Sequence, residues 1–291
     1  LGNCLYITTP ALTNTASMFS LTSHWALAGQ VINCTGWNVV NVVNMNSMFA
    51  DIGRAESPGG SVVIDAAGWQ VQKVTDMGGL LMDSSGSNRI THIYGMGAWQ
   101  TSALQNIDLL LWGRGPAMTG LDVTNWDVTK VTTAMMFASG IGTATTSQLN
   151  LSLWNTALLS VLTRAFFGTG GAITGASTLV TNNVINMDLM YSITDMSPSI
   201  TALNLGSVIS CSNIIAGARM LQTEYDTILA KWATGSSLSG ETMGPPRANA
   251  FNGLPNDSGP APIAQFYSAS ATTNRNTLLS RGWTLSDGGV N

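Results

Sequence analysis

Apolar residues recur along the chain at a fixed set of offsets, in copies that start near residues 7, 37, 69, 99, 126, 154, 179 and 203. The clearest copy has its apolar side chains at Trp37, Val42, Met45, Met48 and Phe49. The spacing between copies falls from 30 residues, between 7 and 37, to 24 residues, between 179 and 203. A pattern repeated at such a period is typical of a solenoid, whose stacked units share one core. We therefore predict an α/β solenoid of about eight coils.

Each repeat divides into two halves with different patterns. The second half has apolar residues at i, i+3, i+6 and i+7, as from Val42 to Phe49, and this spacing predicts a short helical segment. The first half alternates or is continuously apolar, as in Val62 to Ile64 and Ile90 to Tyr94, and predicts a short strand. We expect one strand and one short helical segment per coil, with the strands stacked in parallel.

Two copies depart from the pattern. The first has Thr15 where an apolar residue is expected, which suits a terminal and half-exposed coil. The copy that starts at Trp126 is read with a slip of one residue, so that Met135, Met136 and Phe137 fill the apolar positions.

The repeats stop near Ala216, and we predict two domains: a repeat solenoid over 1–216 and a C-terminal cap over 217–291. In the cap, residues 223–233 predict a helix with Thr223 as its N-cap. A Pro/Gly-rich stretch follows over 235–262. A second helix is expected at about 270–281, ended by Gly282, with a strand over 283–285. Such a cap covers the last coil of an open stack.

The apolar positions of the repeat predict a continuous core. Its best-defined members are Trp37, Trp69, Trp99, Trp126, Trp154, Met45, Met48 and Phe49. The tryptophans favour a buried spine in which each indole N–H finds a carbonyl, and an exposed aromatic ladder is the alternative. Trp25 and Trp112 lie outside the pattern, and together with His92, in an alternating stretch, they are the candidate contact residues.

Composition narrows the classes of function. Charged residues are only 9% of the chain, against about 25% in ordinary soluble proteins. The net charge is −4 and no basic stripe is present, which argues against nucleic acid as a partner. No apolar run reaches the roughly 20 residues of a membrane-spanning helix. The chain opens at Leu1, which suggests a processed or truncated start.

The search for chemistry predicts no catalytic residue, no metal and no cofactor. The histidines, His24 and His92, have no Cys or His at zinc-ligand spacing, and no phosphate-binding loop or nucleophile elbow occurs. Cys211 takes an apolar position of the repeat and is expected to be buried. Cys4 and Cys34 precede consecutive repeats by similar distances, so they either pair across adjacent coils or stay separate.

The segment from Asn125 to Thr132, with the sequence NWDVTKVT, and the segment from Trp37 to Phe49 carry a resemblance. Both resemble the repeat of BspA-like leucine-rich-repeat surface proteins, over roughly residues 5–216. The ending over 278–289 is similar to the terminus of such proteins in bacterial and prophage genomes. The resemblance implies a leucine-rich-repeat-like solenoid with no catalytic residues, in a secreted or virion-exposed protein.

The function expected is that of a non-enzymatic surface recognition or structural protein, a phage virion or bacterial cell-surface component. Its partners would be neighbouring subunits of that assembly, or a host surface protein or glycan. One alternative is a carbohydrate-binding adhesin that uses Trp25 and Trp112. A second is a polysaccharide hydrolase, which requires that two or three carboxylates, among Asp65, Asp122 and Asp127, converge on one groove.

Overall fold

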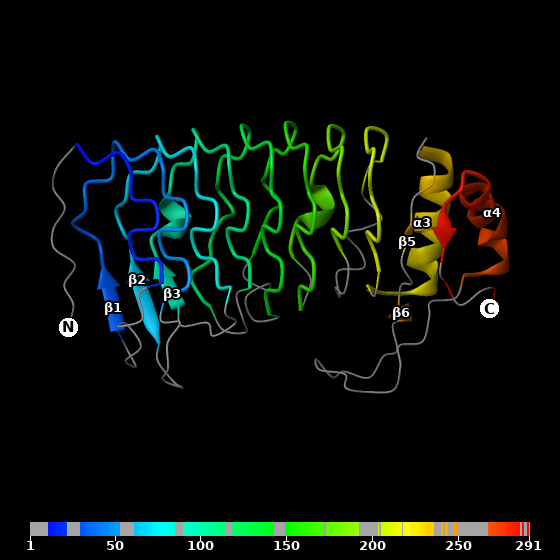
Figure 1. Cartoon of the computed structure of the whole chain (residues 1–291), viewed down its shortest axis with the longest axis horizontal. Coiled ribbons are helices and arrows are strands. Elements are labelled where there is room, and N and C mark those ends of the chain that lie inside the picture. Colours follow the sequence, from blue (N-terminus) through cyan, green and yellow to red (C-terminus); the bar gives the residue numbers. More distant parts are fainter. Residues whose placement is uncertain are drawn as a thin grey trace.

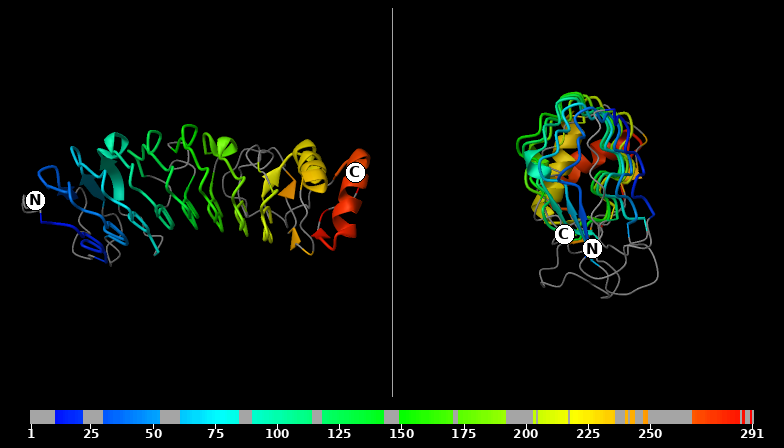
Figure 2. Two further views of the ribbon diagram at one scale, coloured as in Figure 1. Left: turned by 90° about the horizontal axis from the view of Figure 1, so that it is seen from above. Right: turned by 90° about the vertical axis from the view of Figure 1, so that its left-hand side faces the viewer.

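The computed structural model describes residues 11–21, 30–52, 61–84, 90–113, 118–142, 149–170, 173–191, 203, 205–216, 218–235, 240, 242–243, 247–248, 267–285, 287 and 290. Figure 1 shows an elongated molecule in which consecutive turns of the chain lie side by side along the long axis. Seen down that axis, the turns superpose on a common outline (Figure 2). The chain has a repeat-like α/β fold with a three-stranded parallel sheet and few helices.

The parallel sheet is built from the first halves of three repeats. Its strands are β1 (Gln30–Asn33), β2 (Val62–Asp65) and β3 (Ile90–Tyr94), in the order β1-β2-β3. The sequence prediction of strands at the second and third of these places is confirmed. One side chain in two points inward, and Ile32, Ile64 and Ile93 are buried. Single parallel bridges continue the line, from His92 to Thr119 and from Asn150 to Thr174.

A second ladder runs the length of the stack through the other half of the repeats. Parallel bridges join equivalent residues in the order Asn14, Asn44, Asp76, Asn106, Thr133, Val161, Asn186 and Ser210. The Asn44 side chain accepts the amide of Asn46 at 2.8 Å, which fixes the turn that follows. Thr133 holds the position of Asn44 but has no side-chain carbonyl to accept the amide two residues ahead. The Asp108 carboxylate of the preceding repeat takes this place: it accepts the Met135 amide at 2.6 Å and the Thr133 hydroxyl at 2.8 Å.

The second half of each repeat is not helical, which corrects the prediction of one short helical segment per coil. Over residues 42–50 the amides of Met48 and Ala50 bond to carbonyls three residues earlier, as in turns. The Phe49 amide between them donates to the Leu80 carbonyl of the next repeat at 3.0 Å, as the Ser47 amide does to the Gly78 carbonyl at 2.8 Å. Because an α-helix bonds every amide to its own chain at i−4, a segment that gives alternate amides to its neighbour cannot be helical.

Each of these turns holds one residue with a left-handed backbone at the same position of the repeat. The non-glycine members, with φ between 53° and 58°, are Ser17, Ser47, Leu109, Met136, Arg164, Leu189 and Asn213. Such a conformation costs about 1–2 kcal/mol for an L-residue. The hydrogen bonds to the next repeat offset that cost, and only Gly79 in this row adopts the conformation freely.

The copy at Trp126 keeps the register of the others, so the predicted slip of one residue is wrong. Ala134, Phe137 and Ala138 are buried, whereas Met135 is 37% exposed. The bridge at Thr133 holds the backbone in line with its neighbours, and the large Phe137 ring fills the space between two small alanines.

The first copy also differs from its prediction. Thr15 is 1% exposed, not half-exposed. Its amide and its hydroxyl both donate to the Asn44 carbonyl, at 3.0 and 3.4 Å, so the polar side chain is satisfied inside the stack.

The structure places the eight predicted core side chains inside, none more than 7% exposed. Trp37, Trp69, Trp99 and Trp126 stack in a row with ring centroids 6.1, 5.9 and 6.0 Å apart. Three indole N–H groups donate to a carbonyl of the preceding repeat: Trp69 to Cys34 at 2.8 Å, Trp126 to Met96 at 3.2 Å and Trp154 to Val123 at 2.8 Å. Each acceptor lies three residues before the preceding anchor of the repeat. The buried N–H groups of Trp37 and Trp99 have no such partner among the described residues.

The hydrogen bond of the Trp126 indole predicts that phenylalanine lowers stability more at Trp126 than at Trp99. Trp126→Phe removes ring volume and the bond to Met96, whereas Trp99→Phe removes ring volume and relieves a buried N–H that has no acceptor. We expect Trp126→Phe to lower the free energy of unfolding by about 1 kcal/mol more than Trp99→Phe. Urea unfolding followed by far-UV circular dichroism measures both, and equal losses would contradict the assignment of the bond.

The C-terminal part packs two helices, α3 (Gln222–Gly235) and α4 (Thr272–Ser280), at the end of the stack (Figure 1). Helix α4 follows η4 (Ala269–Ala271) and ends at Ser280, just before the predicted stop at Gly282, and the Gly282 and Trp283 amides return to the last carbonyls of the helix. Thr223 is not the N-cap of α3. The helix starts earlier, because the Glu224 carboxylate accepts the Leu221 amide at 2.6 Å.

Two pairs of short parallel strands connect segments of the cap. Strand β4 (Arg219–Met220) pairs with β6 (Arg247–Ala248), and β5 (Thr242–Met243) pairs with β7 (Thr284–Leu285), both in parallel. Strand β7 coincides with the predicted strand after Gly282. The remaining described helices are the 3-10 turns η2 (Met96–Ala98) and η3 (Ala176–Thr178) within the repeats.

A buried polar network ties α3, α4 and the tail of the chain. Arg275 binds Asp287 through two nitrogens, at 2.8 and 3.0 Å, and the Tyr225 hydroxyl donates to the same carboxylate at 2.9 Å. Arg281 donates to the Ala233 carbonyl at 2.8 Å, near the C-terminus of α3. Arg281 and Asp287, the charged residues of the segment 278–289, therefore have structural partners within the cap.

Buried tyrosines predict a loss of stability at alkaline pH. Burial, and then the Asp287 carboxylate, raise the pKa of Tyr225, and burial raises the pKa of Tyr191. Because an unfolded tyrosine loses its proton near pH 10 while the folded one keeps it, stability is constant below that pH and falls above it, by up to about 1.4 kcal/mol per pH unit for each group. Urea unfolding between pH 8 and 11 measures the slope, and the Tyr191→Phe, Tyr225→Phe double variant should flatten it. An unchanged slope in that variant would contradict the prediction.

Several predictions fall on residues outside the described ranges. They include Cys4, Trp25, His24 and most of the Pro/Gly-rich stretch. The pairing of Cys4 with Cys34 therefore stays a prediction. The division into two domains at residue 216 also stays a prediction. Cys34 and Cys211 are both buried.

Candidate functional site

The outer surface of β1, β2 and β3 is a continuous face of mixed polar and apolar side chains, which we call the sheet face. Its residues are Val31, Asn33, Val63, Asp65, His92 and Tyr94. Register places Val31, Val63 and His92 in one row and the other three in a second. Val31 is 45% exposed and Tyr94 is 51% exposed, so large side chains stand out from a rigid, hydrogen-bonded backbone.

An irregularity in β3 brings His92 onto this face. The pairing passes from Val62 with Ile90 to Val63 with His92, so Thr91 is an extra residue in the strand. Such a bulge changes the phase of a strand and re-aims its side chains. As a result both Ile90 and Ile93 are buried although three positions separate them.

His92 is held by its neighbours in a defined orientation. Its Nδ1 lies 2.5 Å from the Thr119 hydroxyl oxygen, and that hydroxyl donates to the Thr91 carbonyl at 3.1 Å. Because the hydroxyl proton is used there, Nδ1 is the donor in the bond between His92 and Thr119. Gly120 has a φ of 80°, and a Cβ there would lie 3.1 Å from Nε2 and 2.2 Å from the Ile93 carbonyl oxygen. Glycine at this position therefore makes room for the ring.

Tyr94 completes an aromatic pair on the sheet face. Its ring centroid lies 4.0 Å from that of His92, at an interplanar angle of 55°. The neighbouring Asn33 and Asp65 each accept a backbone amide two residues ahead, from Thr35 at 3.1 Å and from Ala67 at 3.2 Å. Asn33 and Asp65 lie in the same row of the sheet face as Tyr94. The sequence prediction considered His92 but missed Tyr94, whose signal is its place at the end of the same alternation.

The three carboxylates of the hydrolase hypothesis occupy separate turns. Asp65, Asp122 and Asp127 each accept an amide two residues ahead, at 3.2, 3.1 and 3.0 Å. Hydrogen bonds from the Thr129 hydroxyl and amide lower the pKa of Asp127, the opposite of what a general acid requires. Each carboxylate therefore stabilises its own turn, and none lines the apolar cavity or the open hollow described next.

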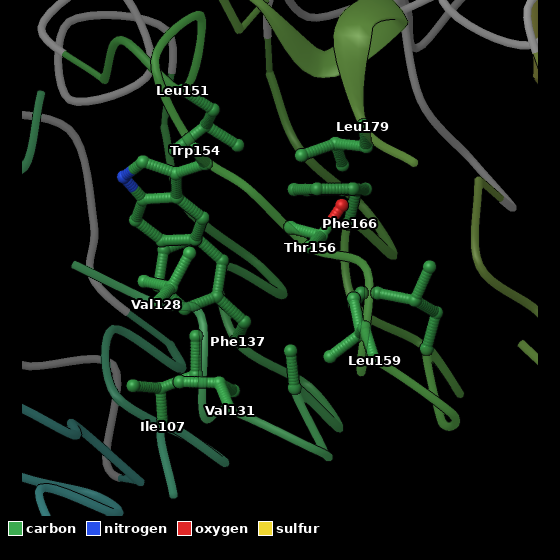
Figure 3. Close-up of a pocket in the computed structure, with 13 residues that line it drawn as sticks. Ile107, Val128, Val131, Phe137, Leu151, Trp154, Thr156, Leu159, Phe166 and Leu179 are labelled. Carbon is green, nitrogen blue, oxygen red and sulfur yellow. The ribbon is translucent and has the colours of Figure 1, made fainter. Parts of the chain in front are cut away.

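The enclosed cavity lies in the core where the row of stacked tryptophans ends. Figure 3 shows Trp154, Phe137, Phe166 and Leu179 around it. Its volume is about 10 Å³ and its surface is apolar, so it suits neither a ligand nor a hydrogen-bonded water. The Trp154 ring is tilted 60° against Phe137, and this change of packing leaves the gap.

A second hollow, of about 520 Å³, opens to solvent over turn residues of the early repeats. Its lining includes Thr35, Gly36, Trp37, Asn38 and Gln70. It gathers no titratable side chain, so its chemistry is limited to hydrogen bonds and contact with the indole edge.

Comparison with known proteins identifies the family of this chain. Two matches to one family model cover residues 6–113 and 114–232, which is most of the chain. That family is described as "Mycoplasma protein of unknown function, DUF285". The chain belongs to the DUF285 family. No curated protein and no solved structure matches it. DUF285 is associated with BspA-like surface repeat proteins, which agrees with the resemblance of the sequence to surface repeat proteins.

Two of the contact residues predicted for this DUF285 chain, His92 and Trp112, lie at different places in the repeats. His92 lies on the sheet face, and Trp112 lies, partly buried, on a turn two positions after the buried Leu110. Trp25 lies outside the described residues. Within the described ranges no group of three His, Cys, Asp or Glu side chains is placed to hold a metal ion.

The helices of the DUF285 chain are short. None of those described is long and apolar enough to cross a membrane.

Proposed function

We propose that this DUF285 chain is a leucine-rich-repeat-like solenoid of about eight coils that acts as a non-enzymatic recognition or structural protein at a cell or virion surface. The ladder of bridges from Asn14 to Ser210 supports the solenoid, because it links every repeat to the next. The BspA-like motif and the family association support the surface location. Neighbouring subunits of the same assembly, or a host surface protein, are the proposed partners.

The observation that carries the proposal is the sheet face. Its backbone is fixed by parallel pairing, so Val31, His92 and Tyr94 are presented without the cost of ordering a loop. Rigid aromatic side chains beside amide and carboxylate groups are typical of protein contact surfaces. Recognition would then depend on area and shape rather than on a pocket.

The separation of the carboxylates supports a non-enzymatic role. Asp65 and Asp122 belong to turns two repeats apart, and Asp65, Asp122 and Asp127 each accept an amide of their own turn. A glycosidase needs a carboxylic acid with a raised pKa, whereas hydrogen bonds from Thr129 lower the pKa of Asp127.

The location is tested on the cells or particles that produce the chain. Antibodies against the purified protein should label intact cells or virions in immunogold electron microscopy, and brief protease treatment should remove the label. Labelling seen only after permeabilisation would overturn the proposal.

The contact role of the sheet face is tested with the purified protein. The Val31→Glu, Tyr94→Ala double variant should lower binding to those cells or particles at least tenfold in flow cytometry. The matched control is Val43→Glu, whose exposed aliphatic side chain lies on the other ladder. Equal losses in the two variants would contradict a role for the sheet face.

A carbohydrate ligand is the second candidate, favoured by the exposed Tyr94 ring beside the side chains of Asn33 and Asp65. Glycan-array binding that is lost in Tyr94→Ala, and retained in Trp112→Ala, would place the ligand on the sheet face. The reverse pattern would favour Trp112, and no binding to any glycan would reject this candidate.

A further inference from the structure

The coil over residues 11–21, where the described stack begins, carries a row of backbone carbonyls that point away from the second coil. We call this row the carbonyl edge, and its members are the carbonyls of Asn14, Ala16, Met18 and Ser20. The alternate amides point the other way and donate to the second coil at 2.9 to 3.1 Å, from Thr15, Ser17, Phe19 and Leu21. None of the four carbonyls has a hydrogen-bond partner among the described residues.

The equivalent carbonyls of the next coils are filled. In the second coil those of Asn44, Asn46, Met48 and Ala50 accept the four amides of the first coil. In the third coil the carbonyls of Asp76, Gly78, Leu80 and Met82 accept four amides of the second coil at 2.8 to 3.0 Å. The repeat is therefore covered on this side by the amides of the coil before it, and an open row of this kind is a template for pairing with another chain.

A side chain on the same edge supports this reading. Met18 is 39% exposed. Its equivalents in the seven later repeats are at most 1% exposed, and they are Met48, Leu80, Leu110, Phe137, Ala165, Met190 and Ile214. A terminal repeat that ends a stack usually carries polar residues on its outer face. The first coil keeps the methionine of an internal coil instead.

The backbone of the carbonyl edge selects its partner. Ser17 and Leu21 both have a φ of 56°, and Ser47 and Asp51, at the same positions of the second coil, have φ values of 53° and 52°. A chain that follows the edge must turn at the same places, which a straight strand does not do. Only a coil with the backbone of this repeat presents its alternate amides along such a path.

A second copy of this chain does not supply these donors. Its own carbonyl edge offers acceptors only, so two such edges cannot bond to each other. The opposite end of the stack is covered by α3 and α4 (Figure 1). The apolar side chains of the last coil there are at most 1% exposed, at Cys211, Ile214 and Ile215.

From these observations we infer that the carbonyl edge docks a further coil of the same repeat, which lies ahead of the first coil in the same polypeptide. Its amides, at the positions of Met45, Ser47, Phe49 and Asp51, would donate to the four carbonyls. A single coil cannot fold alone, so a coil on a separate molecule would bear the whole cost of its ordering. A coil continuous with the first one stacks at high effective concentration. The sheet face stays free in this arrangement, so the inference is independent of the contact role proposed for that face.

Coverage of the edge is tested by methionine oxidation of the native protein, on the cells or particles that produce the chain. Met18 is 39% exposed and Met135, on the fifth coil, is 37% exposed, so hydrogen peroxide should oxidise both at similar rates in purified residues 1–291. In the native protein the docked coil should slow the oxidation of Met18 about fivefold or more relative to Met135. Peptide mapping by mass spectrometry measures both rates, and it shows whether the native protein carries the repeat ahead of Leu1.

The specificity of the edge is tested by joining a copy of residues 30–62 ahead of Leu1. The copy keeps the register, because Val63 lies six positions before Trp69, as Leu1 lies before Ile7. It should slow the oxidation of Met18 about fivefold or more and leave that of Met135 unchanged. It should also raise the urea midpoint, because each interface between repeats adds stability. The matched control is a scrambled copy of the same composition, which should do neither.

Protection of Met18 in the native protein, and by the true copy but not the scrambled one, supports the docked coil. Equal oxidation of Met18 and Met135 in the native protein overturns it. Equal oxidation of Met18 in the chains extended by the true and the scrambled copy also overturns it. Protection in a native protein that has no repeat ahead of Leu1 overturns it as well, because another molecule then covers the edge.

Discussion

Replacement of Trp99 by alanine is expected to lower the free energy of unfolding by about 3–5 kcal/mol. The Trp99 ring is 1% exposed and stacks between Trp69, at 5.9 Å, and Trp126, at 6.0 Å. The substitution opens a cavity in the middle of the stack, where neighbouring repeats are tied by bridges and cannot move in to fill it.

The measurement is urea unfolding followed by far-UV circular dichroism, which does not depend on the tryptophan removed. The control is Tyr94→Ala, which deletes an aromatic ring that is 51% exposed and should cost no more than about 1 kcal/mol. Similar losses in the two variants would mean that the tryptophan row does not form the core.

The apolar register was predictable from the sequence because it is a property of side chains. The core positions of each repeat differ in residue type, with Met45, Met77 and Cys211 at one of them, yet they share one offset and all are buried. Burial of apolar area imposes this pattern whether the backbone between these positions is helical, extended or folded into turns. The strands over Val62–Asp65 and Ile90–Tyr94 followed from the same reasoning.

The backbone of the Met-Phe segment was not predictable in the same way. Apolar residues three apart suit a helix, and they also suit two consecutive turns of three residues each. The difference lies in whether the Ser47 amide bonds to its own chain or to Gly78 in the next repeat, and a single repeat read alone carries no sign of that choice. The predicted slip at Trp126 failed for a related reason, since the bridge at Thr133 overrode the attraction of Met135 and Met136 to the apolar positions.

The surfaces were the least predictable part. His92 reaches the sheet face because Thr91 is an extra residue in β3, and the bulge depends on the pairing with β2. Ile185 and Ile209 directly follow the buried Val184 and Val208, and only their place in the outward row identifies them as exposed. Solvent exposure is a property of the assembled stack, so a contact surface becomes visible only once the repeats are in register.

Loss of the Asp287 carboxylate is expected to destabilise the cap by about 3 kcal/mol or more. In Asp287→Ala the Arg275 guanidinium loses two hydrogen bonds, and the Tyr225 hydroxyl loses its acceptor. The Asp287 side chain is 1% exposed and that of Arg275 is 18% exposed, so water replaces these bonds only in part. The effect should appear as faster hydrogen exchange in α3 and α4 and as a lower midpoint in urea.

A double-mutant cycle separates the ion pair from simple loss of packing. Arg275→Met alone leaves a buried carboxylate without its cation, whereas the double variant with Asp287→Ala leaves no unpaired charge. The double variant should therefore be more stable than the sum of the two single losses predicts, by at least about 1 kcal/mol. Asp127→Ala, at an exposed turn, is the control and should cost less than about 1 kcal/mol. Additive losses in the cycle would mean that Arg275 and Asp287 act independently. The ion pair would then not be what stabilises the segment 278–289.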